Sequence, residues 1–214
     1  MALAGSVVSP SFGKRYAVLN LDFMNILFDI AKGAPEGQRF VSNCSRWVDA
    51  VHKRDPRPLT VFTTLYFTNP SRAELPREAP FTKLVNGFAT FDEHSPAVKI
   101  PSCLNVDDKD TVLQKIRWYG GAGNDLEEIL RKNNIDTIII SGLSLSGVVM
   151  STVYRLFDLD YNIYVISDNV LELPMTDHEK FSAVFLDSLM PKMNLKVITL
   201  SEALEALEHS KIDL

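Results

Sequence analysis

The sequence predicts an α/β fold with three layers, in which a six-stranded parallel sheet lies between two layers of helices. Apolar runs with strand character alternate along the chain with helical patterns, and this alternation is typical of a parallel sheet covered on both faces. With 214 residues, 46% of them hydrophobic and 23% charged, the chain is long enough for one domain with a substantial core. We therefore predict a single Rossmann-like domain over residues 1–214 with right-handed connections.

Each predicted element rests on its own apolar pattern. The predicted strands are 16–21, 59–67, 112–115, 137–141, 162–167 and 195–200. Helical patterns occupy 40–52, 125–132, 147–157, 177–190 and 202–207. Candidate caps support these divisions, because Asn124 and Ser201 precede helices and Thr176 has capping-box spacing to Glu179.

Two segments do not follow this alternation. Residues 1–14 precede the first strand and are predicted to be a flexible N-terminal segment. Residues 68–101 are rich in proline and too long for a simple connection in a compact domain. We predict that they form a lid or an interface, with contacts from Phe81, Phe88 and Phe91, and the alternative is a small satellite core under a loop.

Composition and charge exclude several classes of protein. The net charge is −5 and basic residues are not clustered, so neither nucleic acid nor an anionic membrane is the expected partner. Cys44 and Cys103 are the only cysteines, too few for a disulfide framework or a zinc site. The N-terminus lacks the pattern of a signal peptide, and no window reaches about 18 apolar residues. We expect a cytoplasmic protein without metal or cofactor, although unconventional secretion leaves no such pattern.

The most informative stretch runs from residue 138 to 168 and reads as a strand, a Gly/Ser turn, a helix and another strand. Ser141, Gly142, Ser144 and Ser146 lie where the buried strand would meet the N-terminus of the helix. Free N–H groups and the positive end of the helix dipole occur at such a place. The turn is therefore a candidate oxyanion site.

Two earlier segments place charged residues at the ends of predicted strands. Asp22 follows the apolar run AVLNL, and Lys115 ends the run that begins at Val112. Ligands of open α/β sheets bind outside the carboxyl ends of the strands. Asp22, Lys115 and the Gly142 turn therefore predict one pocket built from three distant segments.

In order and spacing, these three segments resemble the isochorismatase-like hydrolases, also called the cysteine hydrolase superfamily. That family includes nicotinamidases, N-carbamoylsarcosine amidases and isochorismatases. The resemblance runs from residue 16 to about residue 207; the family's Asp and Lys correspond to Asp22 and Lys115, Asn25 is retained, and Met24 stands where Gln is usual. It implies the strand order three-two-one-four-five-six, in which Lys115 would reach across to Asp22, and a homodimer or homotetramer.

The resemblance breaks at the nucleophile. The family's Cys lies six positions after the turn Gly, and counting from Gly142 leads to Val148. Covalent catalysis needs a thiolate or an activated hydroxyl, and Ser144, Ser146 and Ser151 have no histidine placed to activate them. Nicotinamidase-type chemistry is therefore not expected. Isochorismatases, by contrast, hydrolyse a vinyl ether without Cys and commonly carry a small or apolar residue at this position.

For such a reaction the resemblance implies that Asp22 protonates the enol-pyruvyl methylene carbon and that water captures the resulting cation. Pyruvate and a dihydrodiol would be released. As a general acid near neutral pH, Asp22 needs a pKa above the usual ~3.9, which burial against Phe23, Phe28 and Trp118 would supply. Lys115 would lower the same pKa, so the two groups would titrate together.

The remaining candidates surround these groups. In the family, backbone N–H groups that correspond to those of Ser144 and Val148, on either side of Gly147, form the oxyanion hole, and the bond corresponding to Leu143–Ser144 is cis in many relatives. Arg117, like Arg72, is a candidate partner for a substrate carboxylate. The other candidate substrate-binding residues are Asn25, Phe28, Trp118 and Tyr119, of which Trp118 and Tyr119 could equally be core residues.

Two hypotheses follow. The first is a hydrolase that cleaves isochorismate or a similar small carboxylated ring without a covalent intermediate. The second is an inactive family member that keeps the fold to bind a small molecule or to assemble. Loss of the Cys is compatible with both.

Overall fold

A computed structural model of the chain describes residues 10–69, 71–88 and 91–212. Its centre is a six-stranded sheet in which all neighbouring strands are parallel, in the order β3-β2-β1-β4-β5-β6. This confirms the predicted α/β class and strand order. The strands are β1 (Tyr16–Leu21), β2 (Leu59–Leu65), β3 (Thr111–Lys115), β4 (Thr137–Leu143), β5 (Asn162–Leu171) and β6 (Lys196–Ile198).

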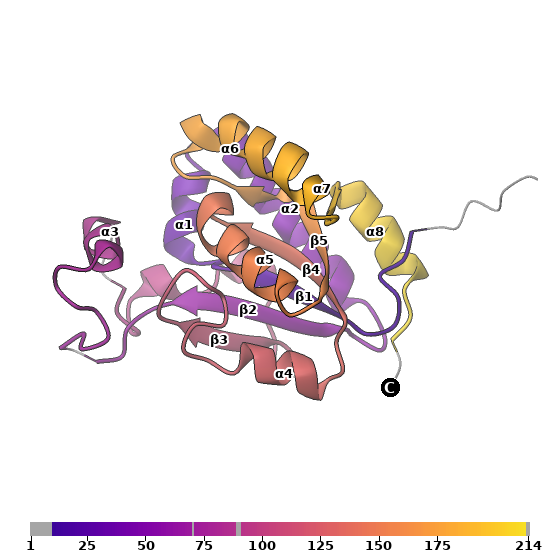
Figure 1. The fold of residues 1–214 in the computed structure, drawn as a ribbon, viewed down its shortest axis with the longest axis horizontal. Coiled ribbons are helices and arrows are strands. Elements are labelled where there is room, and N and C mark those ends of the chain that lie inside the picture. The colour runs from indigo at the N-terminus through magenta and orange to yellow at the C-terminus, as the bar shows by residue number, and fades with distance from the viewer. Residues whose placement is uncertain (1–9, 70, 89–90, 213–214) are drawn as a thin grey trace, which may run out of the picture.

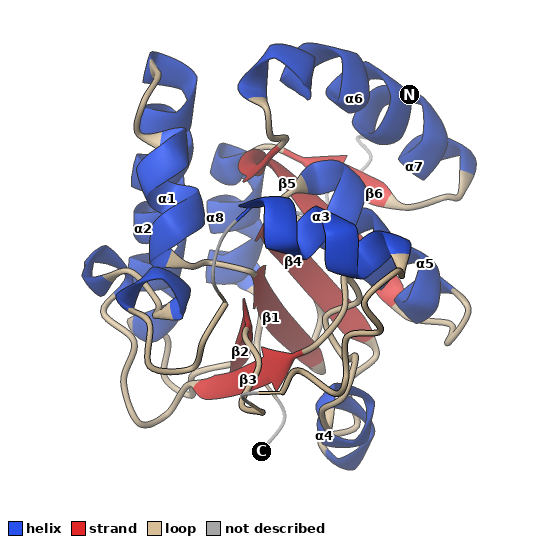
Figure 2. Ribbon diagram, turned by 90° about the vertical axis from the view of Figure 1, so that its left-hand side faces the viewer, coloured by secondary structure: helices blue, strands red, loops and turns tan. Residues whose placement is uncertain are grey.

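Helices cover both faces of the sheet, which Figure 2 shows nearly end-on between its two helical layers. The helices α1 (Asn25–Ala31), α2 (Pro35–His52) and α8 (Leu200–His209) lie on one side. On the other side lie α4 (Leu126–Lys132), α5 (Met150–Phe157), α6 (His178–Val184) and α7 (Met190–Lys192). The α3 helix (Pro80–Phe88) stands apart, near the carboxyl ends of the strands (Figure 1).

The central strands are apolar without alternation because both of their faces are buried. All six residues of β1 and all seven of β4 are buried. Since successive side chains of a strand point to opposite faces, Leu19 packs in a cluster with α4 and α5, whereas Val18 packs in a cluster with α2 and α8. Each strand thus joins two halves of the core.

The α1 helix is missing from the sequence prediction, which has no element between residue 21 and residue 40. It packs closely against α2, because Gly37 lies so near Ala31 that a methyl group on Gly37 would lie 1.9 Å from the Ala31 carbonyl oxygen. The α2 helix also begins earlier than predicted, with Pro35 in its first turn, a position where proline loses no helical hydrogen bond.

Two of the three predicted caps are wrong. Asn124 accepts a hydrogen bond from the Leu126 N–H group, at 3.0 Å, although the residue at the N-cap of α4 is Asp125. A 3-10 turn, Met175–Asp177, precedes α6 instead of a Thr176 capping box, and no side chain caps that helix. The α8 helix is capped by Thr199 rather than Ser201, in a complete capping box with Glu202.

The described residues cover part of the N-terminal segment 1–14 and most of the 68–101 segment. Of the predicted N-terminal segment 1–14, residues 1–9 lie outside the described residues; Phe12 is buried and its N–H group donates to Ser210 Oγ at 2.8 Å. The Phe88 side chain also lies outside the description, whereas Phe91 is buried with the core. In the described ranges, no helix has the length and apolarity needed to cross a membrane.

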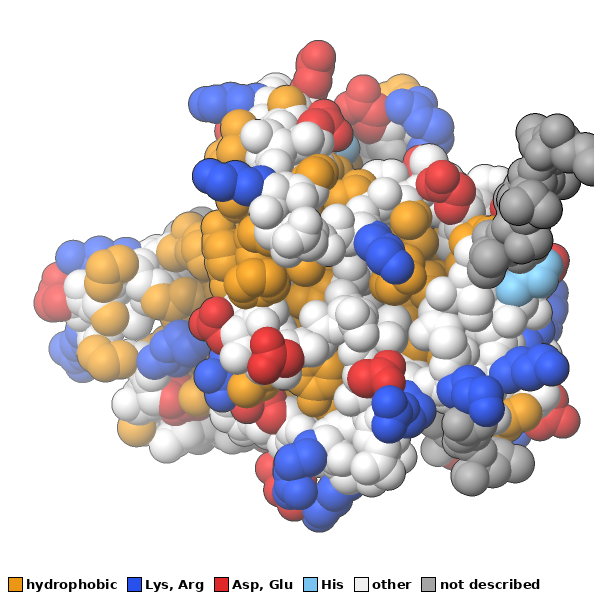
Figure 3. All heavy atoms as spheres, turned by 45° about the vertical axis from the view of Figure 1, so that its right-hand side comes forward, with side chains coloured by type: hydrophobic (Ala, Val, Ile, Leu, Met, Phe, Trp, Pro, Cys, Tyr) orange, Lys and Arg blue, Asp and Glu red, His pale blue; other side chains and the backbone are white. Residues whose placement is uncertain are grey.

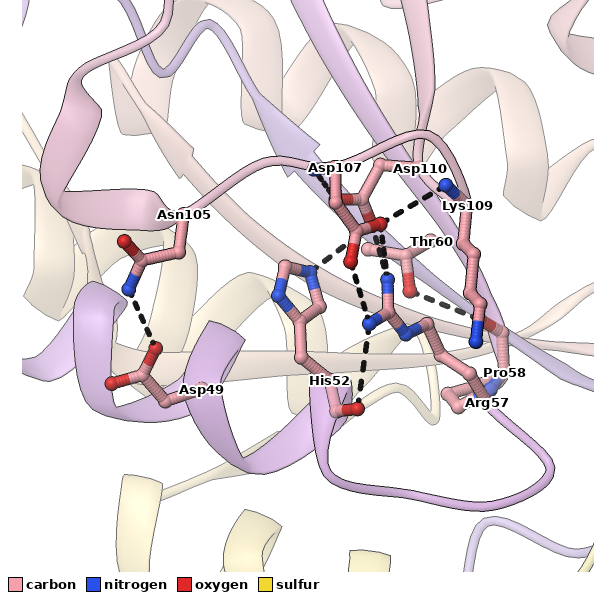
Figure 4. Close-up of polar contacts among 9 residues, drawn as sticks. All are labelled: Asp49, His52, Arg57, Pro58, Thr60, Asn105, Asp107, Lys109 and Asp110. Carbon is pink, nitrogen blue, oxygen red and sulfur yellow. Dashed lines mark hydrogen bonds and ion pairs between the residues drawn. The ribbon is translucent and has the colours of Figure 1, made fainter.

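A group of charged side chains ties the start of edge strand β3 to the end of α2 (Figure 4). Arg57 forms two hydrogen bonds with Asp107, at 2.6 and 2.9 Å, and His52 Nε2 lies 3.1 Å from Asp110. The Arg57 guanidinium lowers the pKa of Asp107 to about 2. These contacts hold in place the strand that carries Lys115 at its other end.

Candidate active site

A cavity of about 360 Å³ opens at the carboxyl ends of the strands. Its wall is largely apolar, with contributions from the segment after β1, the end of β2, the α3 region and the end of β4. Among the apolar residues are Met24, Leu27, Leu65, Phe81, Phe91 and Leu143, and the polar ones are Asp22, Ser144, Ser146, Glu172 and Asp177. Figure 2, which looks toward these strand ends, shows α3 in front of them.

Asp22 and Lys115 form a buried ion pair at this edge of the sheet. Lys115 Nζ lies 2.8 Å from Asp22 Oδ2, and the two side chains are 0% and 8% exposed. Because β2 lies between β1 and β3, Lys115 extends across one intervening strand to reach Asp22. Its ammonium group also donates to the Arg117 carbonyl, at 2.7 Å.

The backbone and a neighbouring hydroxyl hold Asp22 in place. Its φ of 56° lies in the left-handed region, which a short polar residue such as Asp tolerates better than most. The Asp22 N–H group donates to Thr63 Oγ1 at 3.0 Å, and the Thr63 hydroxyl donates to Asp22 Oδ1 at 3.0 Å. The carboxyl group is therefore fixed by two partners.

Burial raises the pKa of Asp22 above its usual value, although Lys115 and the Thr63 hydroxyl act in the opposite direction. Desolvation disfavours the charged carboxylate, whereas a nearby cation and hydrogen bonds favour it. A raised pKa is what a carboxylic acid needs to donate a proton near neutral pH.

The turn after β4 brings Ser144, Gly147 and Val148 together at the cavity. The Leu143–Ser144 peptide is cis, and a π-helical turn, Leu145–Val149, follows and leads into α5. A methyl group on Gly147 would lie 2.6 Å from Ser144 Oγ and 3.3 Å from the Trp118 ring, so a larger residue here would have to move the Ser144 hydroxyl. Val148 is buried and lines the cavity.

Glu172 is a site residue that sequence reasoning missed. It is 3% exposed and lines the cavity. Its two carboxylate oxygens accept hydrogen bonds from the N–H groups of Ser146, at 2.6 Å, and Leu173, at 3.1 Å. The Glu172 N–H group in turn donates to His178 Nδ1 at 3.2 Å, and burial lowers the pKa of His178.

Glu172 could have been predicted as a site residue from its position directly after a strand. The sequence predicts that the fifth strand ends at residue 167, but β5 continues to Leu171 after a register shift against β4. With the correct strand end, Glu172 is the first residue beyond a buried parallel strand, as Asp22 is after β1.

Of the candidate substrate-binding residues, Trp118 lines the cavity. Phe28 instead packs against Phe23 and Phe40 in the core. The Asn25 side chain donates to the Pro96 carbonyl at 2.9 Å. Phe28 and Asn25 thus support the segment after Asp22 from behind the cavity wall.

The side chains of Arg117 and Tyr119 also bind other residues of the chain and do not line the cavity. The Arg117 guanidinium donates to the carbonyls of Ile116 and Glu74 and lies over the Phe81 ring, 5.2 Å from its centre. The Tyr119 hydroxyl donates to Glu127 at 2.7 Å. Arg72 lies 5.8 Å from the centre of the Phe67 ring, and no Arg or Lys side chain lines the cavity in the described parts of the chain.

Neither cysteine belongs to the cavity wall: Cys44 is buried and Cys103 is exposed elsewhere. Over residues 10–69, 71–88 and 91–212, no three His, Cys, Asp or Glu side chains are grouped so that they could hold a metal ion.

The Isochorismatase domain family matches residues 16–200 of the sequence. The chain belongs to this family. The isochorismatase-family protein YwoC of Bacillus subtilis is 27% identical over 167 residues, or 75% of this chain and 85% of that protein. YecD of Escherichia coli O157:H7 is 35% identical over 68 residues, which cover 32% of this chain and 36% of YecD.

Solved structures show the same isochorismatase-like fold. An isochorismatase family protein from Burkholderia thailandensis has a TM-score of 0.73 and 22% identity, covering 94% of this chain and all of that one. A cysteine hydrolase from Pseudomonas syringae has a TM-score of 0.74 at 17% identity, covering 91% and 92%. The N-carbamoylsarcosine amidase of Thermoplasma acidophilum, at 18% identity, has a TM-score of 0.68, covering 87% and 96%.

Proposed function

We propose that this isochorismatase-family protein is a hydrolase that works by proton transfer from Asp22, without a covalent Cys intermediate. The observation that carries the proposal is the buried Asp22–Lys115 pair at the cavity, with Val148 at the position where the family resemblance places the nucleophile. Neither Cys44 nor Cys103 lines the cavity.

The reaction that suits this arrangement is hydrolysis of a vinyl ether, with isochorismate or a related small ring as the substrate. The Asp22 carboxyl group donates its proton to the terminal methylene carbon, and the C=C electron pair forms the new C–H bond. The oxocarbenium ion that remains adds water at the ether-bearing carbon and loses a proton. The resulting hemiketal collapses to pyruvate and an alcohol, which leaves with the ether oxygen.

Lys115 stabilises the carboxylate that Asp22 becomes when it gives up its proton. The Asp22 carboxylate forms within 2.8 Å of the Lys115 ammonium group, so the charge that develops on Asp22 meets a fixed cation in a buried site. Such preorganised charge stabilises the transition state more than the same charge in water would. The Thr63 hydroxyl, which donates to Asp22 Oδ1, helps to orient the carboxyl group.

The test is pyruvate release from isochorismate by the purified protein and its Asp22→Asn variant. Loss of a general acid commonly costs about 10²- to 10⁴-fold in rate, and we expect a loss in that range from a variant that remains folded. Cys103→Ser is the matched control and should keep the wild-type rate, because Cys103 lies outside the cavity wall. Turnover that survives Asp22→Asn would disprove the assignment of Asp22 as the acid.

The second candidate is a protein that binds a small molecule without turnover. The observation that favours it is that both carboxyl oxygens of Asp22 already have partners within the protein, Lys115 and Thr63. Binding of a ring-shaped ligand together with no turnover in the wild-type protein would support this candidate over the hydrolase.

A further inference from the structure

The cavity holds a second fixed carboxylate, Glu172, beside the proposed acid. We infer that Glu172 makes this site select a ligand that is uncharged or cationic where it meets that wall, rather than one that carries a carboxylate there. The inference rests on the proposed function and refines it, because it requires that any carboxylate of the substrate lies away from Glu172.

The inference rests first on the charges of the side chains that line the cavity. Three carboxylates line it, those of Asp22, Glu172 and Asp177. Lys115, the partner of Asp22, is fully buried and also donates to the Arg117 carbonyl. A ligand carboxylate placed against Glu172 would therefore lie beside another carboxylate, with no Arg or Lys side chain among the described residues of the cavity wall to pair with it, and a buried charge without a partner is costly.

The second step concerns the start of the π-helical turn. The sequence predicts an oxyanion site at this turn with the N–H groups of Ser144 and Val148 as donors, and the N–H group of Ser146 between them is already bonded to Glu172 at 2.6 Å. The chain thus supplies its own anion at this N–H group. To bind the Ser146 N–H group, a substrate carboxylate would have to displace Glu172, which is held by the Leu173 N–H group as well.

The Glu172 carboxylate can still accept hydrogen bonds from a ligand. Each carboxylate oxygen can accept more than one hydrogen bond, and each oxygen of Glu172 uses one for a backbone N–H group. The remaining capacity suits an ammonium, amide or hydroxyl donor. The apolar part of the cavity wall, which includes Leu27, Phe81 and Phe91, suits a small ring that carries such a donor.

Three probes of matched size test this inference: benzylammonium, benzamide and benzoate, each titrated calorimetrically into the full-length protein at pH 7.5. We expect benzylammonium and benzamide to bind at least about tenfold more tightly than benzoate, because each can donate a hydrogen bond to Glu172 and benzoate cannot. Glu172→Gln should reduce the preference for benzylammonium over benzoate by about tenfold or more.

A second variant covers failure of Glu172→Gln to fold, which thermal unfolding would reveal. Asp177→Asn removes another wall carboxylate, whose side chain has no hydrogen-bond or ion-pair partner within the described chain, and should reduce the same preference. Benzoate that binds the wild-type protein as tightly as benzylammonium would overturn the inference, as would an unchanged preference in a folded Glu172→Gln protein. The titrations need no turnover, so failure of the Asp22 mechanism and failure of this inference give different results.

Discussion

At the scale of single residues, Asp22 and Lys115 serve the proposed chemistry at a cost in stability. Burial raises the pKa of Asp22, so the folded state holds the Asp22 proton more tightly than the unfolded state does. The stability that this group contributes is present below its unfolded pKa and is lost as the pH rises through its folded pKa. Near neutral pH the pair therefore depends on Lys115 to offset the desolvation of the carboxylate.

This dependence predicts the behaviour of single and double variants. Lys115→Met should lower the free energy of unfolding by about 3 kcal/mol, because it leaves a buried acid without its partner, and Asp22→Asn should do the same for the ammonium group. The double variant Asp22→Asn/Lys115→Met should recover most of that loss but none of the activity. Urea unfolding at pH 7 measures all three, and two single variants that each lose less than about 1 kcal/mol would contradict the coupling.

Sequence reasoning found Asp22 and Lys115 because each ends a recognisable apolar run and the family resemblance joined them. It missed Glu172 because β5 passes through Ser167, Asp168 and Asn169 before it ends, and such polar residues read as a loop. The buried contacts of Phe28 and Tyr119 depend on side-chain directions, which sequence spacing does not give.

At the scale of elements, the order of the sheet and most helices were predictable, but helix ends were not. The last helix shows why, since Thr199, Leu200, Ser201 and Glu202 contain two candidate caps. The T-x-x-E spacing from Thr199 to Glu202 is the capping-box pattern, and the structure uses it, with the Glu202 N–H group donating to Thr199 Oγ1 at 3.2 Å.

Paired variants distinguish the two caps. Thr199→Ala should reduce the free energy of unfolding by about 1 kcal/mol, because the N-cap side chain is lost. Ser201→Ala should change it by less than about 0.5 kcal/mol, as is usual for exposed positions. Denaturant midpoints would show the difference, and equal losses from both variants would reject the assignment of Thr199 as the dominant cap.

At the scale of the whole molecule, α3 and its neighbours decide how the cavity meets solvent. Phe81, Leu84 and Val85 line the cavity from α3, and Leu84 is 51% exposed. Figure 3 shows hydrophobic side chains gathered in the middle of a face near α3 and α6, two helices whose exposed apolar residues include Leu84 and Val184. We propose that residues 68–101 act as a lid, and that this face takes part in a homodimer or homotetramer.

Hydrogen exchange separates the lid from a fixed wall. Saturation with benzylammonium should slow amide exchange in α3, because a lid that closes on the ligand becomes more protected. The α4 helix, outside the cavity wall, is the control and should not change. Unchanged exchange in α3 despite measured binding would favour the satellite core, and sedimentation of the free protein would test the oligomer separately.

The reach of Lys115 across β2 has a consequence for assembly of the edge of the sheet. Lys115 pairs with Leu65 in the register of β2 and β3, and β3 lies about 10 Å from β1 at usual strand spacings. A slip of one residue in β3 would turn Lys115 to the opposite face of the sheet and leave Asp22 buried without a counterion. The ion pair therefore stabilises the correct register of β3 over a shifted one, because a misaligned edge strand would lose the Lys115–Asp22 contact at the candidate site.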